Sequence, residues 1–313
     1  MQDLNRRRFL GAAVATGAGA ATAGSWAPAA AAQGRGGGRG SVPNNRIAIQ
    51  LYTMRRVMPE GDRRAVRSVL NWLGRVGYTE VELAGYYGFS AEQLRRWLDA
   101  AGLRAVSGHD PLNIDAPDGQ WESAYAATLE GANTLGQEFT GLAWQAGPHT
   151  VERYQALAKR LNDAGRMAAG AGLQFFYHNH NFEFENRQPD GTPLYDILLN
   201  ETDPNLVKFE MDLYWIIAGG ESPLDYLARD PARWPLYHVK DRTWKDRPGE
   251  EDWEDVGPGA IDWPQIFEAG VGRRTDKHYV VEHDWPPLSH PNDAEAEYKT
   301  ARSGVDYLRQ VRW

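Results

Sequence analysis

The chain carries, at residues 173–184, the stretch LQFFYHNHNFEF, and this stretch points to the fold. Its apolar first half, residues 173–177, predicts a buried β-strand. Side chains alternate between the two faces of a strand. His178 and His180 are therefore expected on one face at the end of the strand. Two imidazoles so placed can both bind a metal, or one can bind while the other moves protons.

Three later segments end in the same manner as this one. They are KFEMD at 208–212, PLYHVKD at 235–241 and HYVVEHD at 278–284. Together the four segment ends offer His, Asp, His and Glu. They predict a single polar site on which the ends of four strands converge.

Short apolar runs alternate with amphipathic stretches from Arg46 onward. Strands are expected at 46–53, 79–84, 103–109, 139–144, 173–178, 207–212, 236–240 and 278–282. Helices are expected at 63–76, between Ser90 and Gly102, at 121–135, from Thr150 to 169, and at 193–200, 223–228, 263–269 and 294–311. Eight βα units predict a single-domain (β/α)8 TIM barrel with its active site at the C-terminal strand ends. An open doubly wound sheet is disfavoured, because no glycine-rich phosphate loop follows the first strand.

Composition excludes several classes of protein. The chain has 313 residues, a formal net charge of −8 and no cysteine. An acidic surface argues against nucleic-acid binding, which needs a basic one. The absence of cysteine excludes disulfides, thiolate metal sites and cysteine nucleophiles.

The N-terminus has the features of an export signal. NRRRFLG at 5–11 resembles a twin-arginine motif, an Ala/Gly stretch follows, and residues 29–32 offer small-residue cleavage sites. We therefore expect a signal peptide at 1–32, a flexible linker at 33–45 and the barrel at 46–313. The protein would be exported or periplasmic, and no membrane span is expected after signal removal.

Polar residues end most of the expected strands. In barrel order they are Glu82, His109, Trp144, His178 with His180, Asp212, His238 with Lys240, and Glu282. Taken singly, each has an ordinary explanation; Asp212 can cap a turn, and Lys240 can be a surface charge. Taken together, they favour a metal site. Mixed nitrogen and oxygen ligands suit Mn, Co, Zn or Fe better than Mg or Ca.

The chain resembles the xylose-isomerase-like family of sugar isomerase and epimerase barrels over residues 46–313. The motifs that carry the resemblance are HNHNFEF at 178–184, FEMDLYW at 209–215, HVKD at 238–241, VGPGAIDW at 256–263 and VEHD at 281–284. The resemblance implies a divalent metal held at the ends of strands five to eight, usually by Glu, Asp, His and Glu. Asp212, His238 and Glu282 match the last three positions. His178 stands where many members have Glu, and Glu183 is the alternative fourth ligand.

His180 matches the base of similar dehydratases, such as inosose dehydratase and 3-dehydroshikimate dehydratase. The resemblance then implies that His180 removes a proton beside a ketone, with Lys240 and Glu282 as further catalytic residues. Lys240 would stabilise the enolate, and Glu82, His109 or Glu183 would return a proton to a leaving oxygen.

Tryptophans near the strand ends predict a sugar substrate. Trp144 and Trp215, with Glu82, His109 and Glu183, are the candidate substrate-binding residues, and Trp244 and Trp285 lie after later strands. Trp253 and Trp263 are expected to pack within the protein. No basic, glycine-rich cluster suggests a phosphate, so a neutral keto-sugar or glycoside is favoured.

The favoured function is a metal-dependent lyase or dehydratase acting by β-elimination on a keto-sugar or 3-keto-glycoside. The alternatives are a ketose isomerase or epimerase acting through an enediolate, and a non-catalytic sugar-binding barrel. A nuclease is disfavoured by the acidic composition. The sequence leaves open the identity of the metal, the exact substrate, and whether the protein is a monomer or a homo-oligomer.

Overall fold

The computed structural model describes residues 40–243, 252–271, 276–284, 293 and 295–313. The expected signal peptide, residues 33–39 of the expected linker, Trp244 and Trp285 lie outside the described residues. Residues 40–45 of the expected linker belong to the folded unit. Ser41 bridges to Arg312, Val42 is buried, and Asn44–Arg46 form a 3-10 turn, η2. The folded unit therefore begins before Arg46, because Val42 contributes to its core.

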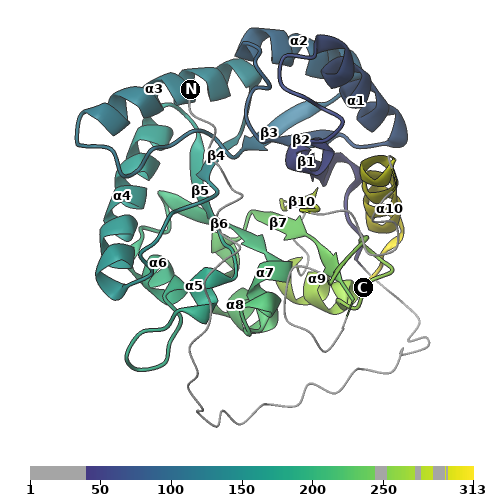
Figure 1. The fold of residues 1–313 in the computed structure, drawn as a ribbon. Coiled ribbons are helices and arrows are strands. Elements are labelled where there is room, and N and C mark those ends of the chain that lie inside the picture. The colour runs from purple at the N-terminus through teal and green to yellow at the C-terminus, as the bar shows by residue number, and fades with distance from the viewer. Residues whose placement is uncertain (1–39, 244–251, 272–275, 285–292, 294) are drawn as a thin grey trace. The chain divides into compact units, whose positions relative to one another are not determined.

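Eight parallel strands form the barrel, in the order β3-β2-β1-β10-β7-β6-β5-β4 (Figure 1). They are β1 Ile47–Gln50, β2 Glu80–Leu83, β3 Arg104–Gly108, β4 Phe139–Leu142, β5 Gln174–His178, β6 Val207–Asp212, β7 Leu236–Val239 and β10 His278–Val281. A parallel bridge between His109 and Gly141 joins the two outermost strands, β3 and β4. The expected TIM barrel is confirmed.

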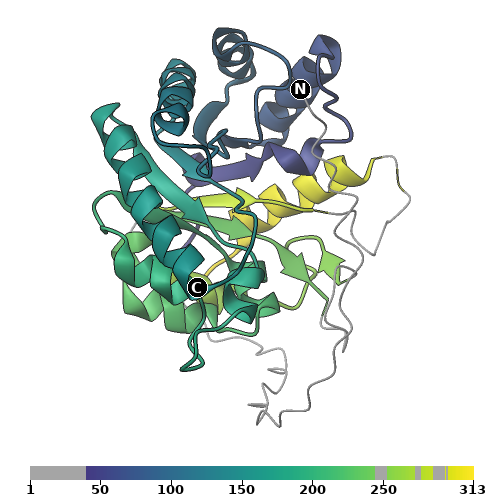
Figure 2. The ribbon, with the colours of Figure 1, turned by 60° about the vertical axis from the view of Figure 1, so that its left-hand side comes forward.

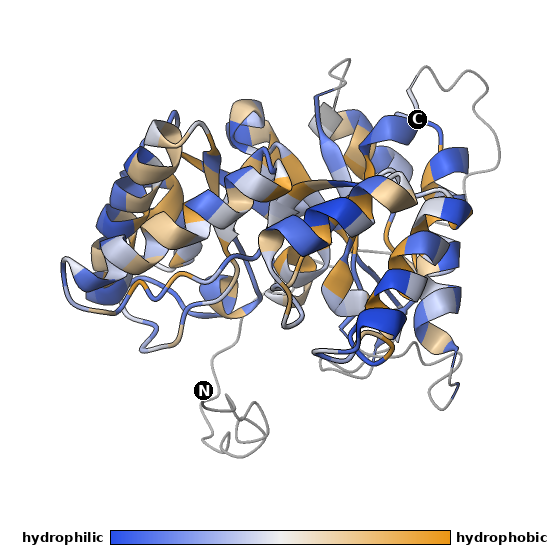
Figure 3. Cartoon of the chain, turned by 90° about the horizontal axis from the view of Figure 1, so that it is seen from above, coloured by the Kyte–Doolittle hydropathy of each residue, from blue (hydrophilic) through white to orange (hydrophobic). Residues whose placement is uncertain are grey.

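Helices surround the strands, as two views show (Figures 1 and 2). They are α1 Arg63–Val76, α2 Ala91–Ala101, α3 Gln120–Leu135, α4 Val151–Gly170, α6 Tyr195–Glu201, α8 Pro223–Arg229, α9 Trp263–Val271 and α10 Ala296–Gln310. A capping box begins α2, with the Ser90 side chain accepting from the backbone N–H of Gln93. Gly77 and Gly102 end α1 and α2 with φ of 113° and 70°, a region that favours glycine. Figure 3 shows polar residues on the outer sides of helices and apolar residues gathered toward the strands.

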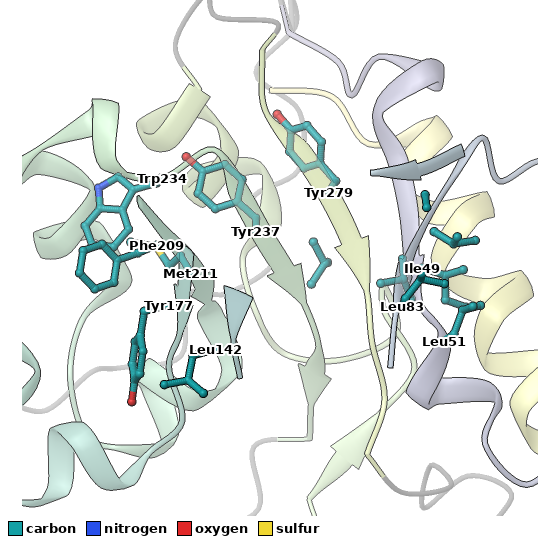
Figure 4. Close-up of a cluster of buried hydrophobic side chains, with 14 of the residues drawn as sticks. Ile49, Leu51, Leu83, Leu142, Tyr177, Phe209, Met211, Trp234, Tyr237 and Tyr279 are labelled. Carbon is teal, nitrogen blue, oxygen red and sulfur yellow. The ribbon is translucent and has the colours of Figure 1, made fainter. Parts of the chain in front are cut away.

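Alternation along the strands separates the core from the site. One set of side chains packs between strands and helices, as Figure 4 shows for Tyr177, Phe209, Met211, Tyr237 and Tyr279. The residues between them in sequence lie on the opposite face of each strand, inside the barrel. The register places His178 beside Glu210 and Asp212 beside His238. The fold therefore brings these four polar side chains together.

Some local structure differs from expectation. β1 ends at Gln50 and continues as a 3-10 turn, η3 Leu51–Met54. Two short helices, α5 Phe182–Glu185 and α7 Leu213–Ala218, follow β5 and β6 without being expected. A small antiparallel pair, β8 Asp241–Arg242 and β9 Trp253–Glu254, follows β7.

Asp241 organises the region after this pair. Its carboxylate accepts hydrogen bonds from the backbone N–H groups of Arg242, Gly257 and Ile261, and from the Trp263 indole, at 2.9–3.2 Å. Contacts distant in sequence thus fix the VGPGAIDW segment against the barrel.

Across the described ranges, no helix combines the length and the apolar character needed to cross a membrane.

Candidate metal centre

The ends of four strands bring together four potential metal ligands, which we call the outer group. They are His178, Asp212, His238 and Glu282. One ligand atom from each lies within 4.8 Å of the others, and all four side chains are buried. Asp212 Oδ2 lies 3.7 Å from both His178 Nε2 and His238 Nδ1, and His238 Nδ1 lies 2.9 Å from Glu282 Oε2. These are the four ligands expected from the sequence.

Lys240 lies against this group and is not a surface charge. Its ammonium is 2.8 Å from Asp212 Oδ2, 2.7 Å from Glu282 Oε2 and 2.9 Å from Asp284 Oδ2, and the residue is 1% exposed. Burial by itself would lower the pKa of Lys240, but the three carboxylates raise it well above its ordinary value. Lys240 therefore stays charged and holds a positive charge at the site.

The outer group fits a divalent cation. Two imidazoles and two carboxylates form a donor set suited to Zn, Mn, Co or Fe. The buried Asp212 Oδ2 accepts no hydrogen bond from a described residue, and its contact with Lys240 is an ion pair without hydrogen-bond geometry. Three carboxylates also face a single ammonium, so a further positive charge would be favourable there.

Deeper in the barrel lies a second set of potential ligands, the inner group: His109, His178, Glu210 and His238. Glu210 Oε2 is 2.9 Å from His109 Nε2 and 3.0 Å from His178 Nδ1. Glu82 adjoins the set, with Oε1 2.8 Å from His238 Nε2 and 3.0 Å from His109 Nε2. Both carboxylates have zero exposure. The sequence predicted Glu82 as a substrate-binding residue, but its carboxylate lies deeper in the barrel, beside the inner group.

Histidines and carboxylates lie close together in and beside the inner group, and each shifts the pKa of the other. Burial alone would lower the pKa of His109, but Glu82 and Glu210 raise it to about 10. Burial alone would raise the pKa of Glu82, but His109 and His238 lower it well below its ordinary value.

Sequence reasoning missed Glu210, although its place two residues before Asp212 on the same strand face was a usable signal.

His180 lies beside the outer group in an aromatic environment. Its ring stacks parallel to Phe182, with centroids 5.4 Å apart, and meets the edge of Trp144 at 4.9 Å. Burial and the charge of Lys240 lower the pKa of His180 to about 3, so its imidazole is neutral at neutral pH. No described residue hydrogen-bonds its buried Nδ1.

Glu183 belongs to neither group of potential ligands among the described residues. Its carboxylate accepts from the Tyr177 hydroxyl at 2.7 Å and from the His180 backbone N–H at 2.9 Å. It therefore braces the turn that carries His180, and the geometry favours His178 over Glu183 as the fourth ligand. Burial raises the pKa of Glu183 to about 8.

The described tryptophans divide into two kinds. Trp144 is 48% exposed beside His180, and Trp215 lies partly buried with its ring 5.4 Å from Lys240 Nζ. Trp253 is buried and stacks on Tyr214, with ring centroids 4.2 Å apart. Trp263 is buried and its indole N–H donates to the Asp241 carboxylate. The expected packing roles of Trp253 and Trp263 are confirmed.

Fold and site together define a (β/α)8 barrel with a cluster of potential metal ligands at its C-terminal strand ends. Residues 70–311 match the family model described as xylose isomerase-like TIM barrel. The chain belongs to this family.

Individual relatives agree with the family assignment. The chain is 24% identical over 262 residues to an inosose dehydratase of Lacticaseibacillus casei, covering 74% of this chain and 86% of the relative. It superposes on a sugar phosphate isomerase/epimerase from Parabacteroides distasonis with a TM-score of 0.68 and 25% identity, covering 85% and 98% of the two chains. A solved IolI protein with a bound zinc atom has the same fold, with a TM-score of 0.64 and 15% identity over 86% of this chain and 99% of its own.

Proposed function

We propose that this protein is a carbohydrate-active enzyme, specifically a metal-dependent lyase. It would remove a proton beside the carbonyl of a keto-sugar or 3-keto-glycoside and expel a group from the next carbon. The observation that carries the proposal is His180. Its imidazole lies next to the outer group, 4.9 Å from the ring of His178, and its buried Nδ1 has no hydrogen-bond partner among the described residues. The similarity to inosose dehydratases supports elimination as the reaction type.

The outer group would hold a divalent cation, with Zn, Mn, Co and Fe favoured by its two imidazoles and two carboxylates. When bound, such a cation supplies Lewis-acid polarisation of a substrate carbonyl. His180 would take the α-proton, and the electron pair of the broken C–H bond would form an enolate. Collapse of the enolate would form a C=C bond and break the bond to the group on the next carbon, which leaves with its electron pair. Lys240 supplies a fixed positive charge near the negative charge that develops on the substrate oxygen.

Two aromatic rings support a sugar as the substrate. Trp144 and Trp215 lie beside His180, with ring centroids 4.9 Å and 5.6 Å from its ring. Flat rings next to polar groups suit a pyranose, which has apolar C–H faces and hydroxyl edges.

Isomerisation or epimerisation of a ketose is the second candidate, because a solved relative is named a sugar phosphate isomerase/epimerase. That reaction would use the same base but would expel no leaving group. Deuterium incorporation from solvent without loss of a leaving group would favour it over elimination.

The proposal is tested by incubating metal-loaded protein with 3-keto-glucosides and with an inosose. We expect an enone absorbance and, from the glucosides, a released aglycone seen by mass spectrometry. His180→Ala should abolish both products. The matched control is His149→Ala, since His149 also packs on Phe182, at 4.6 Å, but belongs to neither group of potential ligands. No product with any of the four metals, together with tight sugar binding unaffected by His180→Ala, would indicate a non-catalytic sugar-binding barrel.

Export to the periplasm is also part of the proposal and rests on the NRRRFLG motif at residues 5–11. Fractionation of cells expressing the full chain tests it. Lysine substitutions at Arg6 and Arg7 should retain the protein in the cytoplasm.

A further inference from the structure

The outer and inner groups share two imidazoles, but each imidazole turns a different nitrogen to each group. His178 presents Nε2 toward Asp212, at 3.7 Å, and Nδ1 toward Glu210, at 3.0 Å. His238 presents Nδ1 toward Glu282, at 2.9 Å, and Nε2 toward both Glu82, at 2.8 Å, and Glu210, at 3.1 Å. The two groups are thus the two sides of one pair of rings.

A neutral imidazole has one lone pair, and its other nitrogen carries a proton. A histidine that binds a cation on one side therefore donates a hydrogen bond on the other. His178 and His238 cannot serve a cation in each group at the same time. One side must hold the cation, and the carboxylates on the other side must accept hydrogen bonds from the two N–H groups.

The hydrogen bonds distinguish the two sides. On the inner side, Glu82 already accepts from Gln50 Nε2 at 2.7 Å and from Ser107 Oγ at 2.6 Å. Glu210 Oε1 has no hydrogen-bond partner among the described residues, but it lies 3.1 Å from His238 Nε2, and Glu210 Oε2 lies 3.0 Å from His178 Nδ1. On the outer side, Asp212 Oδ2 also has no such partner, and it lies 3.7 Å from both rings, too far to accept a hydrogen bond from either. The inner carboxylates are therefore placed to accept from the two imidazoles, and Asp212 keeps an oxygen available for a cation.

We infer that a cation binds His178 through Nε2 and His238 through Nδ1, and that Glu210, with Glu82, accepts a hydrogen bond from the N–H on the opposite side of each ring. Glu210 and Glu82 are then positioning residues, which fix the tautomer and the orientation of both histidines. A carboxylate in this place also makes the ligating nitrogen a stronger donor. The two histidines carry opposite tautomers, with the proton on Nδ1 in His178 and on Nε2 in His238.

The inference rests on the metal of the proposed function but not on the proposed reaction. The first test uses the wild-type protein with 15N-labelled histidine and 113Cd. We expect nitrogen–cadmium coupling at Nε2 of one ring and at Nδ1 of the other. His178→Gln and His238→Gln, made one at a time, assign the two signals. The reversed assignment, or no binding of cadmium or zinc, would overturn the inference.

The second test measures zinc affinity by competition with a chromophoric chelator. Glu210→Gln should weaken affinity by about 10- to 100-fold, the usual effect of losing such a carboxylate. The matched control is Glu80→Gln, since Glu80 is also buried but contacts no outer-group residue among the described interactions. Unchanged zinc affinity in Glu210→Gln would overturn the inference. Zinc binding that is kept in Asp212→Asn but lost in Glu210→Gln would also overturn it, because the cation would then lie on the inner side.

These results separate the two proposals. Absence of lyase turnover with the expected tautomers and affinities would reject the reaction and leave the positioning role in place. If Glu210→Gln does not fold, the tautomers of the wild-type protein still decide the matter.

Discussion

The two ends of the barrel interior contain similar residues with different partners. Glu80 and Glu82, two positions apart on β2, belong to opposite ends. At the N-terminal end, Glu80 contacts His278 Nδ1 at 2.6 Å and pairs with Arg104, while Arg46 lies 2.8 Å from the other nitrogen of His278. At the C-terminal end, the described residues that contact Glu82 are histidines and neutral side chains: His109, His238, Gln50 and Ser107.

The difference lies in the positive charges. Arginines neutralise the N-terminal cluster permanently, because a guanidinium does not lose its proton in proteins. The C-terminal end relies on Lys240 and on histidines, whose protons can be exchanged for a metal. One end is therefore complete as an ion network, while the other is suited to receive a cation.

Removing a carboxylate from the outer group should have the largest effect. Asp212→Ala or Glu282→Ala should abolish metal binding, because each removes one of four ligands. Metal content after dialysis measures this. Glu80→Ala, at the N-terminal end, should keep full metal content; equal loss in all three variants would erase the distinction between the ends.

Removing the base should have the next largest effect. His180→Ala should bind metal as the wild type does but lower kcat by about 10²- to 10⁴-fold, the usual contribution of a general base. Metal content and turnover are measured on the same preparation. If His180→Ala loses its metal, His180 is a ligand and its assignment as base is wrong.

The N-terminal cluster should affect stability rather than chemistry. Glu80→Ala leaves the buried His278 Nδ1 without its carboxylate, while Arg104 keeps its pair with Glu138, which should cost about 1–3 kcal/mol of unfolding free energy. Urea denaturation of the metal-free protein measures this. A loss below about 0.5 kcal/mol, the range of ordinary surface changes, would contradict a structural role.

The last prediction concerns pH and rests on Glu183, a buried carboxyl that pairs with no arginine or lysine among the described residues. Its folded-state pKa of about 8 exceeds the ordinary 4.5, so the folded protein holds a proton that the unfolded chain releases. Stability should therefore fall as pH rises from about 4.5 to about 8, by at most about 1.4 kcal/mol per pH unit. Glu183→Gln should flatten this part of the profile. Identical urea midpoints against pH in both proteins would refute the shift.

The sequence predicted the fold because local signals agreed with it. The helix Arg63–Val76 and the strand Val207–Asp212 were predicted to the residue. Apolar patterning defines both, and Gly77 ends the helix. The four residues of the outer group followed from one rule, that barrel sites lie at C-terminal strand ends.

What was missed depends on contacts between distant segments. Lys240 taken alone resembled a surface charge; carboxylates from the ends of β6 and β10 surround it only in the fold. Glu210 and Glu82 become partners of the same histidines only when β2, β6 and β7 curve into a barrel. The β8–β9 pair likewise has too few residues to be evident from periodicity.

Asp241 gives the loop after β9 an unusual kind of local stability. The amide protons of Gly257 and Ile261 lie outside any strand, yet both are bonded to this one buried carboxylate. Neither should exchange with deuterium until Asp241 releases it, so the two amides should open together as one cooperative unit. A single side chain thus gives an irregular segment the protection usually found in a strand.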